Sequence, residues 1–249
     1  IGGVGADFYN VTTENTPGYD LAPVVAGAVP AIDPSTLPDV NGESIGRRAV
    51  TGDVGVVYNP GGRVNPFIRL GRSYRHPNLE ELLFAGPATA GSIAPSIKVK
   101  PETGTNFDIG TKVNVGRVSG GLYGFVNKYS NFISQEFVAT TPSGPLAQAI
   151  NFGDVRIQGL EFSLDAPIVT PYGVWSVSGA GALTRGTILE GIGPNGLVLD
   201  DSPADNITPS KFVGALRYTE TKGRWWIEYG IRTQTDVDRV ALTLSQSPF

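Results

Sequence analysis

The feature that most constrains this chain is the length of the connections between its segments of alternating polarity. Short and long connections follow one another in turn. If the segments are strands, every short connection lies at one end of an up-and-down sheet and every long one at the other end. Outer-membrane barrels have this arrangement of turns and loops. The short connections are Tyr58–Arg63, Val115–Val118, Pro167–Tyr172 and Thr219–Arg224, and the long ones are Arg75–Pro101, Asn131–Asn151 and Leu189–Thr208.

The segments themselves alternate with a period of two residues. Between residues 103 and 115, one set of alternate positions includes Phe107 and Ile109, and the other includes Asp108 and Lys112. This period predicts strands with one apolar and one polar face, which a soluble sandwich would also show. Because the second face repeatedly carries full charges, a barrel with a polar inside and an apolar, lipid-facing outside is the simpler interpretation.

We therefore predict an all-β fold, an antiparallel up-and-down transmembrane β-barrel of which this chain forms an incomplete wall of about nine strands. An odd number of strands does not close a bacterial barrel, so we expect residues 1–249 to be part of a larger barrel domain. The expected strands are Gly3–Thr13, Arg47–Tyr58, Arg63–Arg75, Thr103–Val115, Val118–Asn131, Asn151–Ala166, Gly173–Leu189, Lys211–Thr219 and Arg224–Val240.

Composition removes several other classes. No apolar run approaches the ~20 residues of a membrane-spanning helix, and the one helical candidate is Pro77–Phe84, where Leu79, Leu82 and Leu83 are spaced for one face. The net charge of −4 gives no basic stripe for a nucleic acid. The absence of cysteine excludes zinc–thiolate sites and thiol nucleophiles. We predict neither a cofactor nor a nucleic-acid partner.

Four sequence motifs follow one another between residues 66 and 161. Residues 66–82 combine a strand with an Arg-x-Pro step and a Leu-x-Glu-Leu turn. Residues 100–110 resemble the lysine-proline-glutamate opening of the next strand, and residues 123–133 an aromatic strand. Residues 151–161 resemble an asparagine-glycine strand that ends in Gly-x-Glu. Together the four motifs resemble the barrel of TonB-dependent outer-membrane receptors. The resemblance is firm from about Val50 to Ala166 and continues as a strand-loop rhythm to Val240.

The resemblance implies a receptor in the bacterial outer membrane whose full form is a 22-stranded barrel plugged by another domain. Such receptors bind scarce nutrients, most often ferric siderophores but also vitamins, other metal complexes or glycans, and import them with energy from the TonB complex. The expected partners are outer-membrane lipid, a small nutrient and TonB. TonB would be reached through a plug domain and TonB box that these residues do not include, and the last barrel strands are also expected outside them.

The motif residues have mainly a structural interpretation. Arg75, Glu80, Glu81, Glu102 and Glu161 are expected at strand ends or on the inner face, where opposite charges pair across the ladder. The motif residues are Arg75, Pro77, Leu79, Glu81, Leu82, Pro101, Glu102, Asn151, Gly159 and Glu161. Residues expected to face the interior and a ligand are Arg69, Asp108, Lys112, Glu228 and Arg232. Aromatic residues near the short turns, expected to anchor the membrane interface, are Trp175, Tyr218, Trp225, Trp226 and Tyr229.

Two other functions remain open at this stage. One is a barrel that acts as a passive porin or adhesin. The other is a barrel hydrolase, in which Ser73, His76 and Glu80 would form a triad, although no nucleophile elbow supports it. We predict that the protein is not an enzyme. The segments Asp20–Asn41 and Phe84–Ser96 contain few charges and no aromatic cluster, so the sequence leaves the substrate open.

Overall fold

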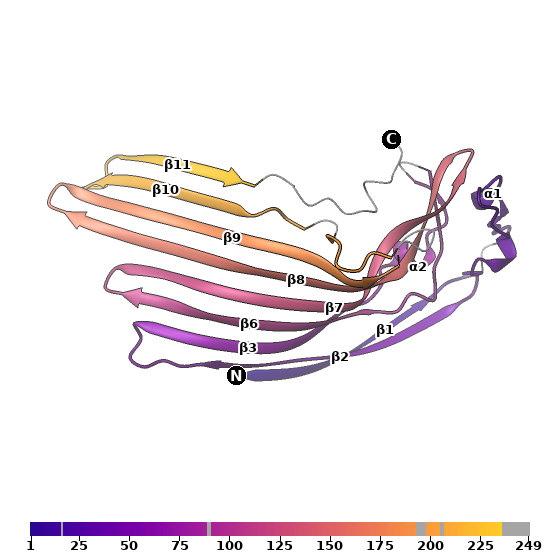
Figure 1. The fold of residues 1–249 in the computed structure, drawn as a ribbon, viewed down its shortest axis with the longest axis horizontal. Helices are drawn as coiled ribbons and strands as arrows, with labels where there is room; N and C mark the ends of the chain where they lie inside the picture. Colours follow the sequence, from indigo (N-terminus) through magenta and orange to yellow (C-terminus); the bar gives the residue numbers. More distant parts are fainter. Residues whose placement is uncertain (16, 89–90, 193–197, 205–206, 236–249) are drawn as a thin grey trace.

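The computed structural model describes residues 1–15, 17–88, 91–192, 198–204 and 207–235. Its main feature is one open antiparallel sheet of nine long strands, which follow one another in the sheet in chain order (Figure 1). The strands are β1 Gly2–Thr12, β2 Ser44–Val57, β3 Val64–Arg75, β6 Glu102–Val115, β7 Val118–Thr141, β8 Gly144–Thr170, β9 Gly173–Gly191, β10 Lys211–Glu220 and β11 Trp226–Gln234. The predicted nine-strand, all-β meander is confirmed.

The expected segregation of connections is also present. The turns β2–β3, β6–β7, β8–β9 and β10–β11 all lie at one end of the sheet, and the longer segments lie at the other (Figure 1). We call these the turn end and the loop end. Small elements at the loop end are α1 Ala22–Val25, the 3-10 helix η1 Pro34–Thr36, α2 Leu79–Leu83, β4 Gly86–Pro87 and β5 Ser92–Ala94. No helix among the described residues is long and apolar enough to cross a membrane.

One predicted loop is wrong. Residues 131–151 do not form a long irregular connection, because β7 continues to Thr141 and β8 begins at Gly144. Asn131 adopts a positive φ of 55°, and the β7–β8 register shifts between Tyr129 and Phe132. The ladder therefore bends there but resumes as a hairpin. With 24 and 27 residues, β7 and β8 exceed the about 9–11 residues that a membrane strand needs, so in a membrane-spanning barrel this hairpin would project beyond the bilayer.

Other element boundaries differ from the prediction by a few residues. The strand β2 begins three residues before the expected Arg47, and β8 ends four residues after Ala166. The strand expected to end at Val240 is described only to Gln234, and residues 236–240 lie outside the described residues. In α2, Leu82 is fully buried whereas Leu79 is 57% exposed, so the predicted shared apolar face is wrong for Leu79.

Alternate residues of the strands build two chemically different faces. On the apolar face, Leu70 pairs with Phe107, and Ile68 with Ile109. The polar face carries Arg69 directly opposite Asp108. Further apolar-face residues, all exposed, are Val54, Val56, Leu122, Val126, Leu160, Phe162, Leu164, Leu183, Phe212, Leu216, Tyr229 and Ile231. An apolar patch that extends over these eight strands far exceeds what soluble monomers expose.

Aromatic side chains gather on the apolar face at the turn end. Trp175 packs on Tyr218 with ring centroids 4.9 Å apart, and Tyr218 packs on Trp225 at 5.3 Å. Tryptophan and tyrosine rings at the end of an apolar face are typical of a membrane–water interface. Trp226 differs, because it lies on the polar face, where the Arg217 guanidinium stands 4.2 Å from its ring centroid.

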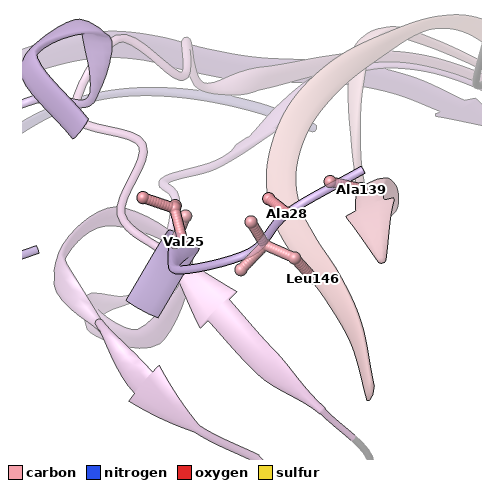
Figure 2. Close-up of a cluster of buried hydrophobic side chains, with 5 residues drawn as sticks. Val25, Ala28, Ala139 and Leu146 are labelled. Carbon is pink, nitrogen blue, oxygen red and sulfur yellow. The ribbon is translucent and has the colours of Figure 1, made fainter. Parts of the chain in front are cut away.

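The loop end has small apolar clusters of its own. Val25 and Ala28, from the segment between β1 and β2, pack against Ala139 and Leu146 of the β7–β8 hairpin (Figure 2). In the same segment Asp33 caps η1 by accepting hydrogen bonds from Ser35, which lowers the pKa of its carboxyl. Packing between loops therefore gives the loop end a defined shape.

Candidate functional site

Three charged side chains meet on the polar face at the loop end. Arg75, the last residue of β3, stands directly opposite Glu102, the first residue of β6. Its Nε and Nη2 donate to the two Glu102 carboxylate oxygens at 3.0 and 2.8 Å, and Nη1 donates to Glu81 at 2.9 and 3.0 Å. Paired hydrogen bonds of this kind hold the guanidinium group in one orientation and balance its positive charge. We call Arg75, Glu81 and Glu102 the rim cluster.

The helix α2 brings Glu81 to Arg75. Asn78 caps this helix by accepting from the Glu81 backbone N–H at 2.7 Å, while the Glu81 carboxylate accepts from the Asn78 N–H at 2.8 Å. This reciprocal capping box begins the helix directly after Pro77, which is fully buried. Leu82 then packs into a buried cluster with Val99, Ile133 and Ala149. The helix is thus held over the polar face by one buried leucine and one shared carboxylate.

Glu102 connects the rim cluster to a third strand. Its side chain is only 8% exposed, and its Oε1 also accepts from the Ile133 backbone N–H at 2.8 Å, just past the bulge in β7. A buried carboxylate needs this number of donors to offset its lost hydration. Glu102 therefore joins β3, β6 and β7 at the point where β7 bends.

Asn151 performs a similar role one strand further on. Its amide nitrogen donates to the carbonyls of Lys100 and Asn131, both at 2.9 Å, and its oxygen accepts from the Lys100 N–H at 2.8 Å. Pro101 lies next to this contact and precedes β6. Nearby, Gln148 donates to the Pro95 carbonyl at 2.8 Å, and β5 pairs in parallel with β8. The segment 76–101 is consequently fastened to β8 as well as to β3.

This segment covers part of the polar face. Arg47, on the polar face of β2, donates through Nη2 to the Ile97 carbonyl at 2.8 Å. Tyr9 of β1 packs against the cluster around Leu82. The segment thus spans the polar face of the sheet from β1 to β8.

The residues expected to face the interior all lie on the polar face. Arg69 is 3.4 Å from Asp53 and 3.8 Å from Asp108. Glu228 is 3.9 Å from Arg217. Lys112, opposite Asn65 and Gly121, and Arg232, opposite Val213, have no ion pair within the described part of the chain. Both are cationic positions on the polar face.

Two motif residues lie away from the rim cluster. Glu161 is exposed on the polar face opposite Tyr123 and Ala182, and it joins no ion pair within the described ranges. Gly159 has a steric role, because a Cβ there would stand 2.3 Å from the Leu183 carbonyl oxygen and 2.8 Å from the Phe125 ring. The aromatic ring of Phe125 therefore occupies the space above this glycine.

The hydrolase arrangement is not formed. Ser73 accepts a hydrogen bond from the Asn106 amide at 3.0 Å. The His76 ring stacks on Tyr9 with centroids 4.8 Å apart, and neither ring nitrogen has a hydrogen-bond partner within the described residues. No hydroxyl is therefore placed for activation by His76, and the alternative of a Ser73–His76–Glu80 triad is not formed.

Sequence reasoning identified the charged members of the rim cluster but missed the residues that position them. The signal for Asn78 was available, since Asn-x-x-Glu is the spacing of a capping box. The Ile133 N–H and the Gln148 amide gave no signal, because their partners are distant in sequence.

Comparison with known proteins identifies the family. The model of the family described as "TonB dependent receptor-like, beta-barrel" matches residues 1–243. This chain belongs to the TonB-dependent receptor barrel family. Members of this family are receptors of the bacterial outer membrane and not enzymes. A comparison with curated protein sequences found no match.

Solved receptors share the fold. The copper transporter OprC is 22% identical with a TM-score of 0.71, and the alignment covers 97% of this chain and 33% of OprC. The Serratia marcescens hemophore receptor HasR is 15% identical with a TM-score of 0.59, and the alignment covers 94% of this chain and 39% of HasR. The FrpB iron transporter of Neisseria meningitidis (F3-3 variant) is 15% identical with a TM-score of 0.58, and the alignment covers 93% of this chain and 30% of FrpB. The chain thus spans roughly a third of the length of these receptors.

Membership of the family gives the two faces their surroundings. In an outer-membrane barrel the apolar face contacts lipid and the polar face lines the interior, while short turns lie in the periplasm and long loops outside the cell. The rim cluster therefore lies inside the barrel wall at its extracellular end.

Proposed function

We propose that this chain is part of an outer-membrane receptor that binds a scarce nutrient and imports it with energy supplied through TonB. The observation that carries this proposal is the match of residues 1–243 to the receptor barrel family. The interior polar face and the extracellular loop end supply the surfaces that such a receptor uses. TonB acts on parts of the protein outside these residues.

For the nutrient we propose a ferric siderophore or a similar metal complex, with a vitamin or a glycan as the next class. Lys112 and Arg232 support an anionic complex, because both are cationic, lie on the interior face and have no ion pair in the described ranges. Arginine and lysine are suited to carboxylate and catecholate oxygens that carry negative charge. Copper and iron transporters among the solved receptors with the same fold are consistent with a metal cargo.

The rim cluster has a positioning role in this proposal. It fixes the segment 76–101 over the interior face, and so it sets the shape of the entrance that the nutrient passes. Arg75 is fully engaged by Glu81 and Glu102, so we assign it to holding the segment and not to contacting the nutrient.

An uptake experiment tests the proposal. The gene for the full-length receptor is deleted in its host, and uptake of 55Fe-labelled siderophores, copper, haem and cobalamin is measured with and without plasmid-borne receptor. We expect at least one of these to depend on both the receptor and TonB. Receptor-dependent uptake that continues without TonB would instead indicate a passive pore.

Substitutions link the uptake to the interior face. Lys112→Gln and Arg232→Gln should each raise the apparent KM for the imported complex several-fold, because each removes a cationic donor. Arg117→Gln, which removes a charge in the β6–β7 turn, outside the polar face of the strands, is the matched control and should leave uptake unchanged. Equal uptake by all three variants would refute the assignment of these two residues.

A further inference from the structure

The lipid-facing side of the sheet carries an unexpected row of basic residues at the loop end. Arg72 pairs with Thr105, Thr105 with Lys128, and Lys128 with Arg156. Directly paired residues project from the same face of a sheet, and these positions have the same alternation as Leu70, Phe107 and Val126 below them. The row therefore lies on the apolar, lipid-facing side and not in the interior.

Arg185 adds a further positive charge to this row. It pairs with Gln158, which lies two residues from Arg156 on the same face of β8, so Arg185 is a diagonal neighbour of Arg156. Arg72 and Arg185 are exposed. With strands about 4.8 Å apart, Arg72 and Arg156 are separated by roughly 14 Å, a span that one lipid headgroup with two phosphates can bridge.

The charges of the row are only partly balanced by the protein. Lys128 pairs with Asp154 at 2.9 Å, and Glu190 lies opposite Asp154 on the next strand. Arg72, Arg156 and Arg185 have no ion pair within the described ranges, and the buried Nε of Arg156 has no hydrogen-bond partner there. Like charges placed directly opposite, as Lys128 and Arg156 are, destabilise a sheet. An anion bound between them would remove this repulsion.

A hollow in the apolar face lies directly below these charges. Its volume is about 490 Å³, and its lining includes Ile109, Gly124, Leu160, Leu183 and Arg185. It exists because Gly124 has no side chain, which leaves open the space between Ile109 and Leu160. Such an apolar hollow is suited to part of an acyl chain whose headgroup lies at the level of the arginines.

We propose that Arg72, Arg156 and Arg185, with the hollow around Gly124, form a binding site for a phosphorylated, multiply acylated glycolipid of the outer leaflet. The phosphates are held by the three guanidinium groups, which suit phosphate geometry. One acyl chain lies over Gly124. The site faces the membrane, so it is distinct from the nutrient path on the polar face.

The test uses the full-length receptor in detergent and a diphosphorylated, hexa-acylated lipid A as the probe. Binding is measured by native mass spectrometry for wild type and for the triple variant Arg72→Gln/Arg156→Gln/Arg185→Gln. At about 1 kcal/mol per basic residue, each charge contributes roughly fivefold, so the triple variant should bind on the order of 100-fold more weakly. The matched control is Arg63→Gln/Arg117→Gln/Lys222→Gln, which removes three charges at the turn end and should bind as wild type does.

A second variant tests the hollow independently of charge. Gly124→Leu fills it, and since a Cβ there meets Leu160 Cδ2 at 3.4 Å, an ordinary contact, the barrel should still fold, as judged by heat-modifiable electrophoretic mobility. We expect weaker binding of lipid A but unchanged binding of its deacylated, diphosphorylated headgroup. Wild-type affinity in both the triple and the Gly124 variants would overturn the proposal. Equally tight binding of phosphatidylglycerol by wild type would reduce the site to a general attraction for anionic lipid and would also overturn it.

Discussion

Replacement of Arg75 by methionine should loosen the segment 76–101 without unfolding the barrel. The Glu102 side chain is 8% exposed and would keep only the Ile133 N–H as donor. Removing one partner of a buried ion pair costs about 3–5 kcal/mol. Because the Arg75 side chain is 42% exposed, water replaces part of the interaction, and we expect about 2–3 kcal/mol of local stability to be lost.

This loss corresponds to a roughly 30- to 150-fold increase in local opening. Hydrogen exchange of the full-length receptor in detergent measures it at the Ile133 amide and the amides of α2, since exchange reports local as well as global opening. Arg69→Met, in the same strand and face, is the control, because Arg69 joins only exposed pairs at 3.4 and 3.8 Å, worth at most about 1 kcal/mol. It should leave these amides unchanged.

A double variant separates lost pairing from lost side-chain volume. Arg75→Met/Glu102→Gln removes the stranded negative charge and leaves an acceptor for the Ile133 N–H, so exchange should return toward the wild-type rate. Wild-type exchange in Arg75→Met alone, or equal acceleration in Arg69→Met, would refute the role assigned to the rim cluster.

Three further substitutions have defined outcomes. Asn151→Ala removes three hydrogen bonds of about 1 kcal/mol each, so limited proteolysis within residues 84–101 should become faster. An unchanged rate would show that these hydrogen bonds do not hold the segment to β8. Gly159→Ala brings a Cβ to 2.3 Å from the Leu183 carbonyl oxygen, whereas a Cβ at Gly179 would be 3.6 Å from the nearest atom. The folded fraction, measured by heat-modifiable electrophoresis, should therefore fall for Gly159→Ala and not for Gly179→Ala. Leu82→Ala empties a fully buried position and should cost about 2–5 kcal/mol locally, seen as faster exchange of α2 amides; protection equal to wild type would show that α2 does not depend on this contact.

The strands and their faces were predictable because alternate side chains contact two different surroundings, lipid and the polar interior. This alternation decides both where the strands lie and which face each residue joins. Phe107 and Ile109 on one side and Asp108 on the other show this in a single strand. Register then places Arg75 opposite Glu102 once the two strands are known to be neighbours. These features depend on local pattern and on chain order.

The hairpin between Asn131 and Asn151 was not predictable in the same way. The bulge at Asn131 changes the register, so the two-residue period breaks there although pairing continues. The turn residues Pro142, Ser143 and Gly144 in the middle of this segment were a signal for a hairpin. The contacts of Asn151 and Gln148 depend on backbone atoms some 50 residues away, which no local pattern reports.

The most direct test of the account is the environment of neighbouring residues in β6. Residues 1–249 contain no cysteine, and in a full-length receptor whose other cysteines are replaced Asp108→Cys and Ile109→Cys can each carry a spin label in a reconstituted bilayer. We predict that the label at 109 collides with lipid-soluble oxygen and that the label at 108 collides with a water-soluble nickel chelate. The opposite pattern, or aqueous accessibility at both positions, would contradict the assignment of the apolar face to lipid and the polar face to the interior.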